Sequence, residues 1–396
     1  MKFIFTFLFL VNGCVGVFAQ NVPFDTQKSQ QPTTKKAENP LERMRQEQQL
    51  NLFKQNEQHI QKVTSSPEQQ KAKTEYLLAE LKADEELEKA HKHDTKGKAI
   101  FKKTLASLET ILQTKQNVSV KNAVFMVENA FYGNTKSLKD FEQQIKVLVI
   151  QCKAFVAANK WKFETQEEKM KGLSSFFETH FHYDFNDFMA INDRQNYLVH
   201  KLLKTKTGQC HSMPLLFKIL ADEIGLQTYI SFSPEHSFIK IKDSKGELHN
   251  FETTNGSFVS NKFIIASGFI NQTALQSKIY NDTLNSYQII AYCVSDLAWN
   301  YKAKYGMTEF SLRCANVIDR YSKNKLHSTM LRSEYYAQQT MKAIKKAGYP
   351  PSSKIYEIPT LKPLLLERDS YYKELDALGQ VEISIEDYQK WLKTTK

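Results

Sequence analysis

The stretch Thr207–Gly256 contains a cysteine, a histidine and a glutamate at positions where a thiol catalyst would need them. Cys210 stands just before a helical pattern, His236 begins a segment that is typical of a strand, and Glu252 lies on the strand predicted next. A thiolate is a nucleophile, an imidazole can accept and return its proton, and a carboxylate can orient the imidazole. The three residue types therefore suggest nucleophilic catalysis.

A helix is predicted to begin beside Cys210. Apolar residues recur at helical spacing in Met213–Ile224, Pro214 lies in the first turn, and Gly225 stands where a helix usually ends. The free N–H groups and the dipole at a helix start stabilise a thiolate, and such positions can lower a cysteine pKa from about 8.5 to roughly 3.5–7.5. Gly208 allows a tight turn before the nucleophile and leaves room for a substrate.

Three strands are predicted after this helix. The run LQTYISFS is rich in β-branched and aromatic residues, HSFIKIK alternates from His236 onward, and ELHNFETTNG carries Glu252. Short turns at 234–235 and 245–246 separate them. A helix followed by three strands can bring the cysteine, the histidine and the glutamate together.

Residues 173–256 resemble the core of the transglutaminase-like superfamily, a papain-like cysteine fold. In that family a Gly-x-Cys opens the core helix, a histidine begins the following strand, and an acid lies on the strand after it. Gly208-Gln209-Cys210, His236 and Glu252 match these places in turn. The resemblance implies an α+β fold, with the cysteine-bearing helix packed on an antiparallel sheet. It also implies a Cys-His-Glu triad that attacks an amide or peptide carbonyl and forms a thioester, which is released to water or to an amine.

Two features depart from the family pattern. The acid is usually aspartate, and Glu252 has a longer side chain that must be set back to reach the imidazole. No residue stands out as the donor of an oxyanion hole; Gln195 and Gln209 are candidates, and Tyr183 is a candidate for contact with oxyanion or substrate. This chemistry needs no metal or organic cofactor, and the sequence signals none.

Other histidines near the cysteine allow further interpretations. His211 follows Cys210 directly, but a neighbour at a helix start points away from its predecessor, so His236 is the better base. His180, His182 and Asp184 could suggest a metal site. We favour a strand entrance whose aromatic residues pack or line a substrate groove. These aromatic residues are Phe181, Tyr183, Phe185 and Phe188.

Residues 1–19 have the pattern of a secretory signal peptide: a basic start, an apolar run too short to span a membrane, and a small-residue cleavage site. We therefore expect a periplasmic or secreted protein, attached to a membrane only if Cys14 belongs to a lipoprotein signal instead. Cys152 and Cys293 lie in apolar helical runs and are expected to be buried free thiols. A disulfide of Cys210 would abolish the catalytic interpretation, and the sequence leaves that alternative open.

The rest of the chain divides by composition into four parts. Residues 20–66 are polar and predicted to be a disordered tether. Residues 67–164 have helical patterns, residues 165–285 form the transglutaminase-like core, and residues 286–396 are again helical. The last part weakly resembles tetratricopeptide hairpins, although no clean repeat is visible.

Charge and composition limit the partners. The net charge is +11, but lysines are spread along amphipathic helices without an RNA-binding motif, so we do not expect nucleic-acid binding. The leading hypothesis is an exported cysteine peptidase, amidase or acyltransferase with a protein or peptide substrate. One alternative is an inactive transglutaminase-like module that binds a partner. Another is that the C-terminal helices act as a scaffold for an envelope complex.

Overall fold

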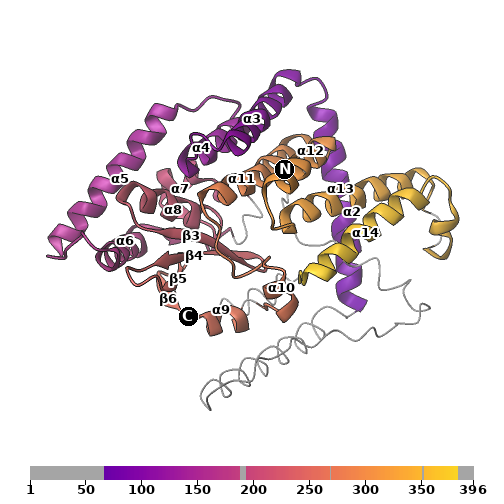
Figure 1. Cartoon of the computed structure of the whole chain (residues 1–396). Coiled ribbons are helices and arrows are strands. Elements are labelled where there is room, and N and C mark those ends of the chain that lie inside the picture. Colours follow the sequence, from indigo (N-terminus) through magenta and orange to yellow (C-terminus); the bar gives the residue numbers. More distant parts are fainter. Residues whose placement is uncertain (1–66, 188–192, 268, 350–351, 382–396) are drawn as a thin grey trace, which may run out of the picture.

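The computed structural model describes residues 67–187, 193–267, 269–349 and 352–381. Helices surround a small antiparallel sheet, which confirms the predicted α+β class (Figure 1). The predicted signal peptide and tether, and residues 382–396 at the end of the predicted C-terminal helical part, lie outside the described residues. Within the described ranges, no helix combines the length and the apolar character needed to span a bilayer.

Within the described residues, five helices precede the first strand, and the first four lie in the part predicted to be helical. They are α2 (Pro67–Ala90), α3 (Thr95–Thr114), α4 (Val120–Phe131), α5 (Leu138–Ala158) and α6 (Gln166–His180). Side-chain caps explain where several of them begin. Thr165 and Glu168 form a capping box at the start of α6, and Ser119 and Ser137 cap α4 and α5.

The central part of the chain carries the strands and the helix that follows Cys210. Its elements are β1 (His182–Tyr183), η2 (Arg194–Tyr197), α7 (Val199–Thr205), β2 (Thr207–Gly208), α8 (Ser212–Ile224), β3 (Thr228–Ser233), β4 (His236–Lys242), β5 (Leu248–Glu252), β6 (Ser257–Val259), α9 (Asn261–Ser267) and α10 (Gln272–Gln276). The helix predicted at Met213–Ile224 and the three strands predicted after it are confirmed. Gly225 ends α8 in the left-handed conformation, as its position in the sequence predicted.

The four-stranded sheet is an antiparallel meander in the order β3-β4-β5-β6. Ser233 pairs with His236 across the β3–β4 turn, and Glu252 pairs with Ser257 at the end of β5. Because adjacent strands run in opposite directions, the start of β4 and the end of β5 lie at the same end of the sheet. The meander therefore places His236 and Glu252 close together.

The sequence did not predict β6, because a three-residue strand is too short to show an alternating pattern. After β6 the chain forms the short helices α9 and α10. Leu284, further along, forms a single bridge to Ile230 at the outer edge of β3. This bridge extends the sheet edge just before the C-terminal helices begin.

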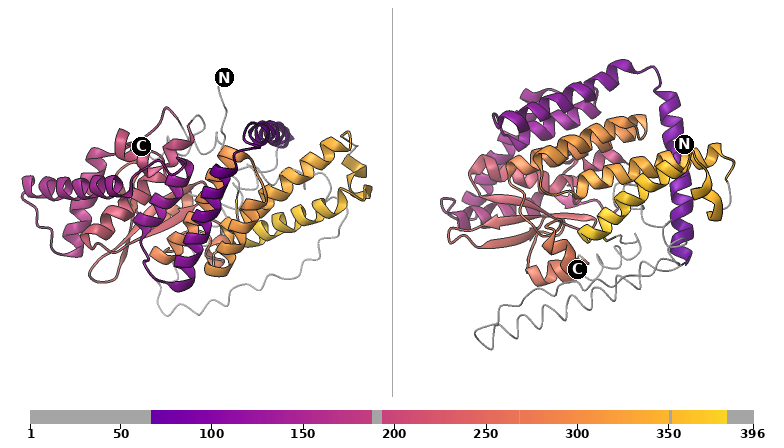
Figure 2. Two further views of the ribbon diagram at one scale, coloured as in Figure 1. Left: turned by 90° about the horizontal axis from the view of Figure 1, so that it is seen from above. Right: turned by 45° about the vertical axis from the view of Figure 1, so that its right-hand side comes forward.

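The C-terminal part consists of helices that pack side by side (Figure 2). They are α11 (Ser286–Tyr305), α12 (Glu309–Tyr321), α13 (Leu326–Lys346), η3 (Ser352–Glu357) and α14 (Lys362–Leu378). Helix α11 starts with a capping box formed by Asn285 and Gln288. It packs against α3 and α4 on one side and α12 on the other.

One large hydrophobic core runs from α3 to α14, and a separate small cluster lies around Leu361 and Leu365. The buried members of the large core extend from Phe101 in α3, through Phe217 in α8 and Phe251 in β5, to Leu375 in α14. Helix α11 is buried along most of its length and lies between the N-terminal helices and the other C-terminal helices. The three regions that composition separates therefore share one core.

Candidate functional site

Cys210 lies immediately before helix α8, where the sequence placed it. The short strand β2 pairs in parallel with β1, and the chain then turns into the helix, which has His211 as its N-cap. Gly208 has no room for a side chain, since an added Cβ would lie 2.6 Å from Ser212 Oγ. Cys210 is only 7% exposed, and its thiol donates a hydrogen bond of 3.8 Å to the carbonyl of Glu235. The nucleophile candidate is thus held at a close-packed turn.

His236 and Glu252 form a hydrogen-bonded pair beside the cysteine. The distance between His236 Nε2 and Glu252 Oε2 is 2.6 Å, and both side chains are buried. The second carboxylate oxygen, Oε1, is buried and accepts no hydrogen bond from the described residues. A buried carboxylate needs a cation or donors nearby, and the imidazole supplies the contact. The longer Glu252 side chain therefore does reach the ring.

The electrostatics of His236 favour its protonated form. Burial alone would lower its pKa, but the Glu252 carboxylate and the hydrogen bonds to Cys210 and Glu252 outweigh burial and raise it to about 10. Because Nε2 is bonded to Glu252, Nδ1 is the ring nitrogen left for the sulfur. The hydroxyl of Ser237, the next residue, donates to the carbonyl of Cys210. The structure thus brings Cys210, His236 and Glu252 together at the start of β4.

Comparison with known proteins gives one match. Residues 139–285 match the family model of the transglutaminase-like superfamily. The chain contains a transglutaminase-like domain. No curated protein and no solved structure matches the chain.

The match agrees with the resemblance seen in residues 173–256 and extends it to α5 and α6. It covers the three members of the candidate triad and ends one residue before α11. The transglutaminase-like domain thus contains the Cys-His-Glu arrangement in full, whereas part of its core comes from helices outside the matched segment.

The candidate oxyanion and substrate residues lie in different surroundings. Gln209 is buried, and its side-chain amide donates to the carbonyls of Asp184 and Asp187 at 3.0 and 2.7 Å. Gln195 is exposed, and its amide oxygen accepts a hydrogen bond from Tyr132. Tyr183 is buried on β1. The contacts of Gln209 indicate that its amide N–H groups hold the loop before the site.

Gln209 offers a test of this holding role. Changing Gln209 to Leu leaves two backbone carbonyls without their donor, and we expect the free energy of unfolding to fall by about 1–3 kcal/mol. Urea unfolding measures this change. The matched control is Gln195→Leu, which removes an exposed amide and should stay within about 0.5 kcal/mol of the unchanged protein. Equal effects of the two changes would contradict the assignment.

The aromatic residues around β1 divide into packed and exposed members. Phe181 and Tyr183 are buried, Phe185 is exposed with its ring 4.9 Å from that of Tyr183, and Phe188 lies outside the described residues. The alternative metal set does not gather: His180 Nδ1 contacts the carbonyl of Phe176 in its own helix. The strand entrance predicted here is confirmed by β1.

Another group of residues could bring metal-ligand atoms together. Asp243, Glu247 and His249 lie at the β4–β5 turn, with one ligand atom each within 4.8 Å of one another. Asp243 already accepts backbone N–H groups from Lys245 and Glu247, and it contacts His249 Nε2 at 2.9 Å. These contacts account for the cluster as a stabilised turn.

The other cysteines of the described chain are poor nucleophiles. Cys152, Cys293 and Cys314 are buried free thiols, which confirms the prediction for the first two, and Cys210 is also free. Burial raises the pKa of Cys152 to about 12 and raises the pKa values of Cys293 and Cys314 as well. They serve as internal references for the reactivity of Cys210.

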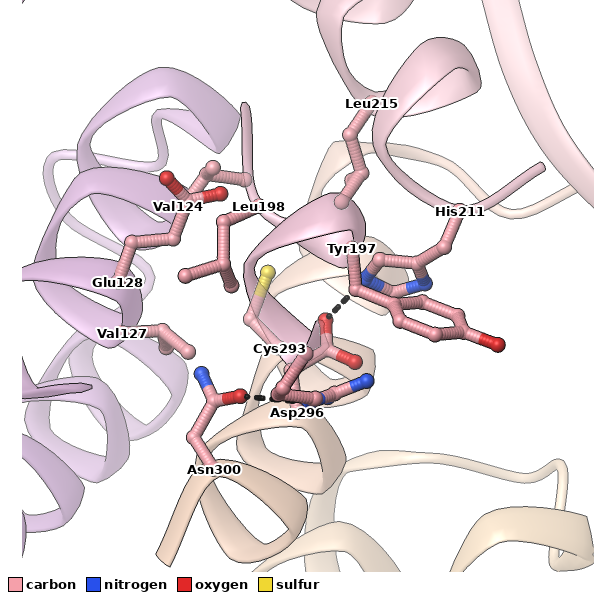
Figure 3. Close-up of a pocket in the computed structure, with 11 residues that line it drawn as sticks. Val124, Val127, Glu128, Tyr197, Leu198, His211, Leu215, Cys293, Asp296 and Asn300 are labelled. Atoms are coloured by element: carbon pink, nitrogen blue, oxygen red, sulfur yellow. Dashed lines mark hydrogen bonds and ion pairs between the residues drawn. The ribbon is translucent and has the colours of Figure 1, made fainter. Parts of the chain in front are cut away.

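The surroundings of His211 were not predictable from the sequence. The side chain of His211 lies with Asp296, Asn300 and Tyr197 around a small buried cavity, which has room for about one water molecule (Figure 3). Asp296 and Asn300 belong to α11, far from the cysteine in the sequence, so no local pattern could have indicated them.

Proposed function

We propose that the transglutaminase-like domain is an active cysteine enzyme that acts on amide or peptide carbonyls. Cys210 is the nucleophile, His236 the general base and acid, and Glu252 the residue that orients the imidazole. The observation that carries the proposal is the 2.6 Å contact between His236 Nε2 and Glu252 Oε2, with Cys210 close enough to the same ring to act on its pKa. This is the order of contacts that an activated thiol requires.

The proposed reaction proceeds through a thioester. The proton of the Cys210 thiol moves to His236, and the sulfur attacks the carbonyl carbon of the substrate. His236 then gives its proton to the nitrogen of the leaving amine, and the carbon–nitrogen bond breaks. Water or a second amine attacks the thioester and restores the thiol, so that the product is an acid or a new amide. A protein or a peptide supplies the carbonyl, and no cofactor takes part in these steps.

The raised pKa of His236 supports a thiolate–imidazolium pair. A histidine has an ordinary pKa of 6.5; burial alone would lower this value for His236, but the Glu252 carboxylate and the hydrogen bonds to the ring outweigh burial and raise its pKa to about 10. His236 therefore remains protonated between pH 6.5 and about pH 10, where an ordinary histidine would be neutral. Its contribution to stability is fully present below pH 6.5 and is lost as the pH rises through about 10. A cation beside the sulfur is the partner that a nucleophilic thiolate requires.

A second function, an inactive binding module, is favoured by the burial of the site. Cys210 is 7% and His236 6% exposed, so a substrate must displace groups that cover the sulfur. An inert module would keep its thiol in this covered position. The two functions differ in the protonation of the sulfur, which can be measured independently of access.

The test is the pH dependence of Cys210 alkylation by iodoacetamide, followed by mass spectrometry of the purified protein. With the ion pair, the rate should change only a few fold between pH 6 and 8. In His236→Ala it should rise about tenfold per pH unit over that range, as for a thiol below its ordinary pKa. Limited access lowers the whole curve without changing its shape. A tenfold rise per unit in the unchanged protein would overturn the enzyme proposal and leave the binding module.

A further inference from the structure

A second histidine–carboxylate pair lies directly beside Cys210. His211 Nε2 is 3.4 Å from Asp296 Oδ2, and Tyr292 donates a hydrogen bond of 2.8 Å to His211 Nδ1. Figure 3 shows His211, the N-cap residue of α8, facing Asp296 of α11. Tyr292 and Asp296 are four residues apart on α11, so they share one face of that helix. Both lie outside the segment that matches the family.

The hydrogen bonds fix how His211 is used. A carboxylate can only accept, so Nε2 carries the proton that faces Asp296, and Nδ1 accepts from the hydroxyl of Tyr292. Burial raises the pKa of Tyr292 well above its usual range, which keeps this hydroxyl protonated and able to donate. Both ring nitrogens of His211 are therefore engaged with α11.

Tyr292 also contacts the strand pair that carries His236. Its ring centroid is 4.8 Å from that of Phe232 on β3. Phe232 pairs with Ser237, the residue after His236, and Ser237 donates to the carbonyl of Cys210. One side chain of α11 thus contacts both the turn that holds the sulfur and the strands that hold the imidazole.

The neighbouring cavity gives the His211 ring space to move if its contact with Tyr292 is lost. It has room for about one water molecule and is lined by His211 and Asp296 together with Arg194 and Asn300. Arg194 donates from Nε to Asn300 Oδ1 at 3.3 Å. If the hydrogen bond from Tyr292 is lost, the His211 ring can shift toward this space, and the start of α8 can shift with it.

We propose that Tyr292 and Asp296 are positioning residues of the transglutaminase-like site. Through His211 they hold the start of α8 so that Cys210 keeps its contact with His236. The inference rests on the proposed function, and it assigns the completion of the site to α11, outside the matched domain.

The variant that isolates this role is Tyr292→Phe. It keeps the ring and its packing against Phe232 and His327 but removes the hydrogen bond to His211. The matched control is Tyr287→Phe on the same helix, which removes a hydrogen bond of 2.7 Å to the carbonyl of Leu112. Both variants lose one tyrosine hydroxyl contact of α11, and only the first concerns the site.

The first readout is the pH profile of Cys210 alkylation. We expect Tyr292→Phe to react roughly tenfold more slowly at pH 6 than the unchanged protein, because a small displacement of the sulfur from the imidazole weakens the ion pair. Its rate should then rise more steeply toward pH 8. Tyr287→Phe should follow the unchanged protein. Identical profiles for both variants, when the unchanged protein shows the flat profile, would overturn the positioning role.

The second readout does not depend on thiol chemistry. Amide hydrogen exchange of peptides covering residues 209–213 should be faster in Tyr292→Phe than in Tyr287→Phe, because the start of α8 opens more readily. Equal exchange in the two variants would overturn the inference whatever the alkylation shows. Faster exchange only in Tyr292→Phe, together with a steep profile in the unchanged protein, would sink the proposed enzyme and retain the anchoring of α8 by α11.

Discussion

Replacing Glu252 by glutamine should lower the rate of Cys210 alkylation at pH 6 by about a hundredfold, toward that of an ordinary thiol. The Glu252 carboxylate is the main group that raises the pKa of His236 against the effect of burial. Glutamine has nearly the same shape and can still accept a hydrogen bond from Nε2, but it carries no charge. The pKa of His236 would fall, so the ring would lose its proton, and the thiolate would lose the positive charge beside it. Alkylation between pH 5 and 9 followed by mass spectrometry measures the change.

Two controls separate charge from geometry at Glu252. Glu252→Asp keeps the charge but shortens the side chain, so we expect an intermediate rate at pH 6 and a flatter profile than in Glu252→Gln. Glu247→Gln removes an exposed carboxylate in the β4–β5 turn, at the opposite end of β5 from Glu252, and should leave the profile unchanged. A flat profile that survives in Glu252→Gln would show that the carboxylate does not sustain the ion pair.

The members of the candidate triad could be predicted because each adjoins a strong local signal. Cys210 precedes an apolar helix with a glycine cap, His236 follows a Pro-Glu turn, and Glu252 ends an alternating strand. A helix and a meander of three strands leave few ways to pack, so the local order determines which ends meet. The sequence therefore predicted the element order around the site and the direction of each strand.

The residues that complete the surroundings could not be predicted in this way. Glu128 of α4 accepts the backbone N–H groups of Val199 and His200 and contacts His200 Nδ1 at 2.5 Å, so it caps α7 from a distant helix. Tyr292 and Asp296 reach His211 from α11 in the same manner. Such contacts depend on tertiary packing, and no spacing within one element indicates them. The prediction that His211 is not the base fits its contacts with Tyr292 and Asp296 on α11. These two contacts were not predicted.

The core shared by the N-terminal and C-terminal helices leads to the second large effect. Phe101 of α3 is fully buried, and its ring lies edge-on to those of Tyr301 and Tyr305 in α11 and Phe310 in α12. The centroid distances are 5.3, 5.8 and 6.3 Å. Truncation of a buried phenylalanine removes its apolar contacts and leaves a cavity. We expect Phe101→Ala to lower the free energy of unfolding by about 3–5 kcal/mol.

The manner of unfolding distinguishes one core from separate regions. Trp299 lies on α11, and in a background with Trp161→Phe and Trp391→Phe its fluorescence reports that helix, whereas circular dichroism reports all helices. If the regions share one core, both signals in urea should shift together to a lower midpoint in Phe101→Ala. Ile150→Ala, at an exposed position of α5, should change the free energy by less than about 0.5 kcal/mol. A shift in only one of two separate transitions would contradict the shared core. Because α11 also carries Tyr292 and Asp296, a joint shift would mean that the stability of the N-terminal helices sustains the positioning of Cys210.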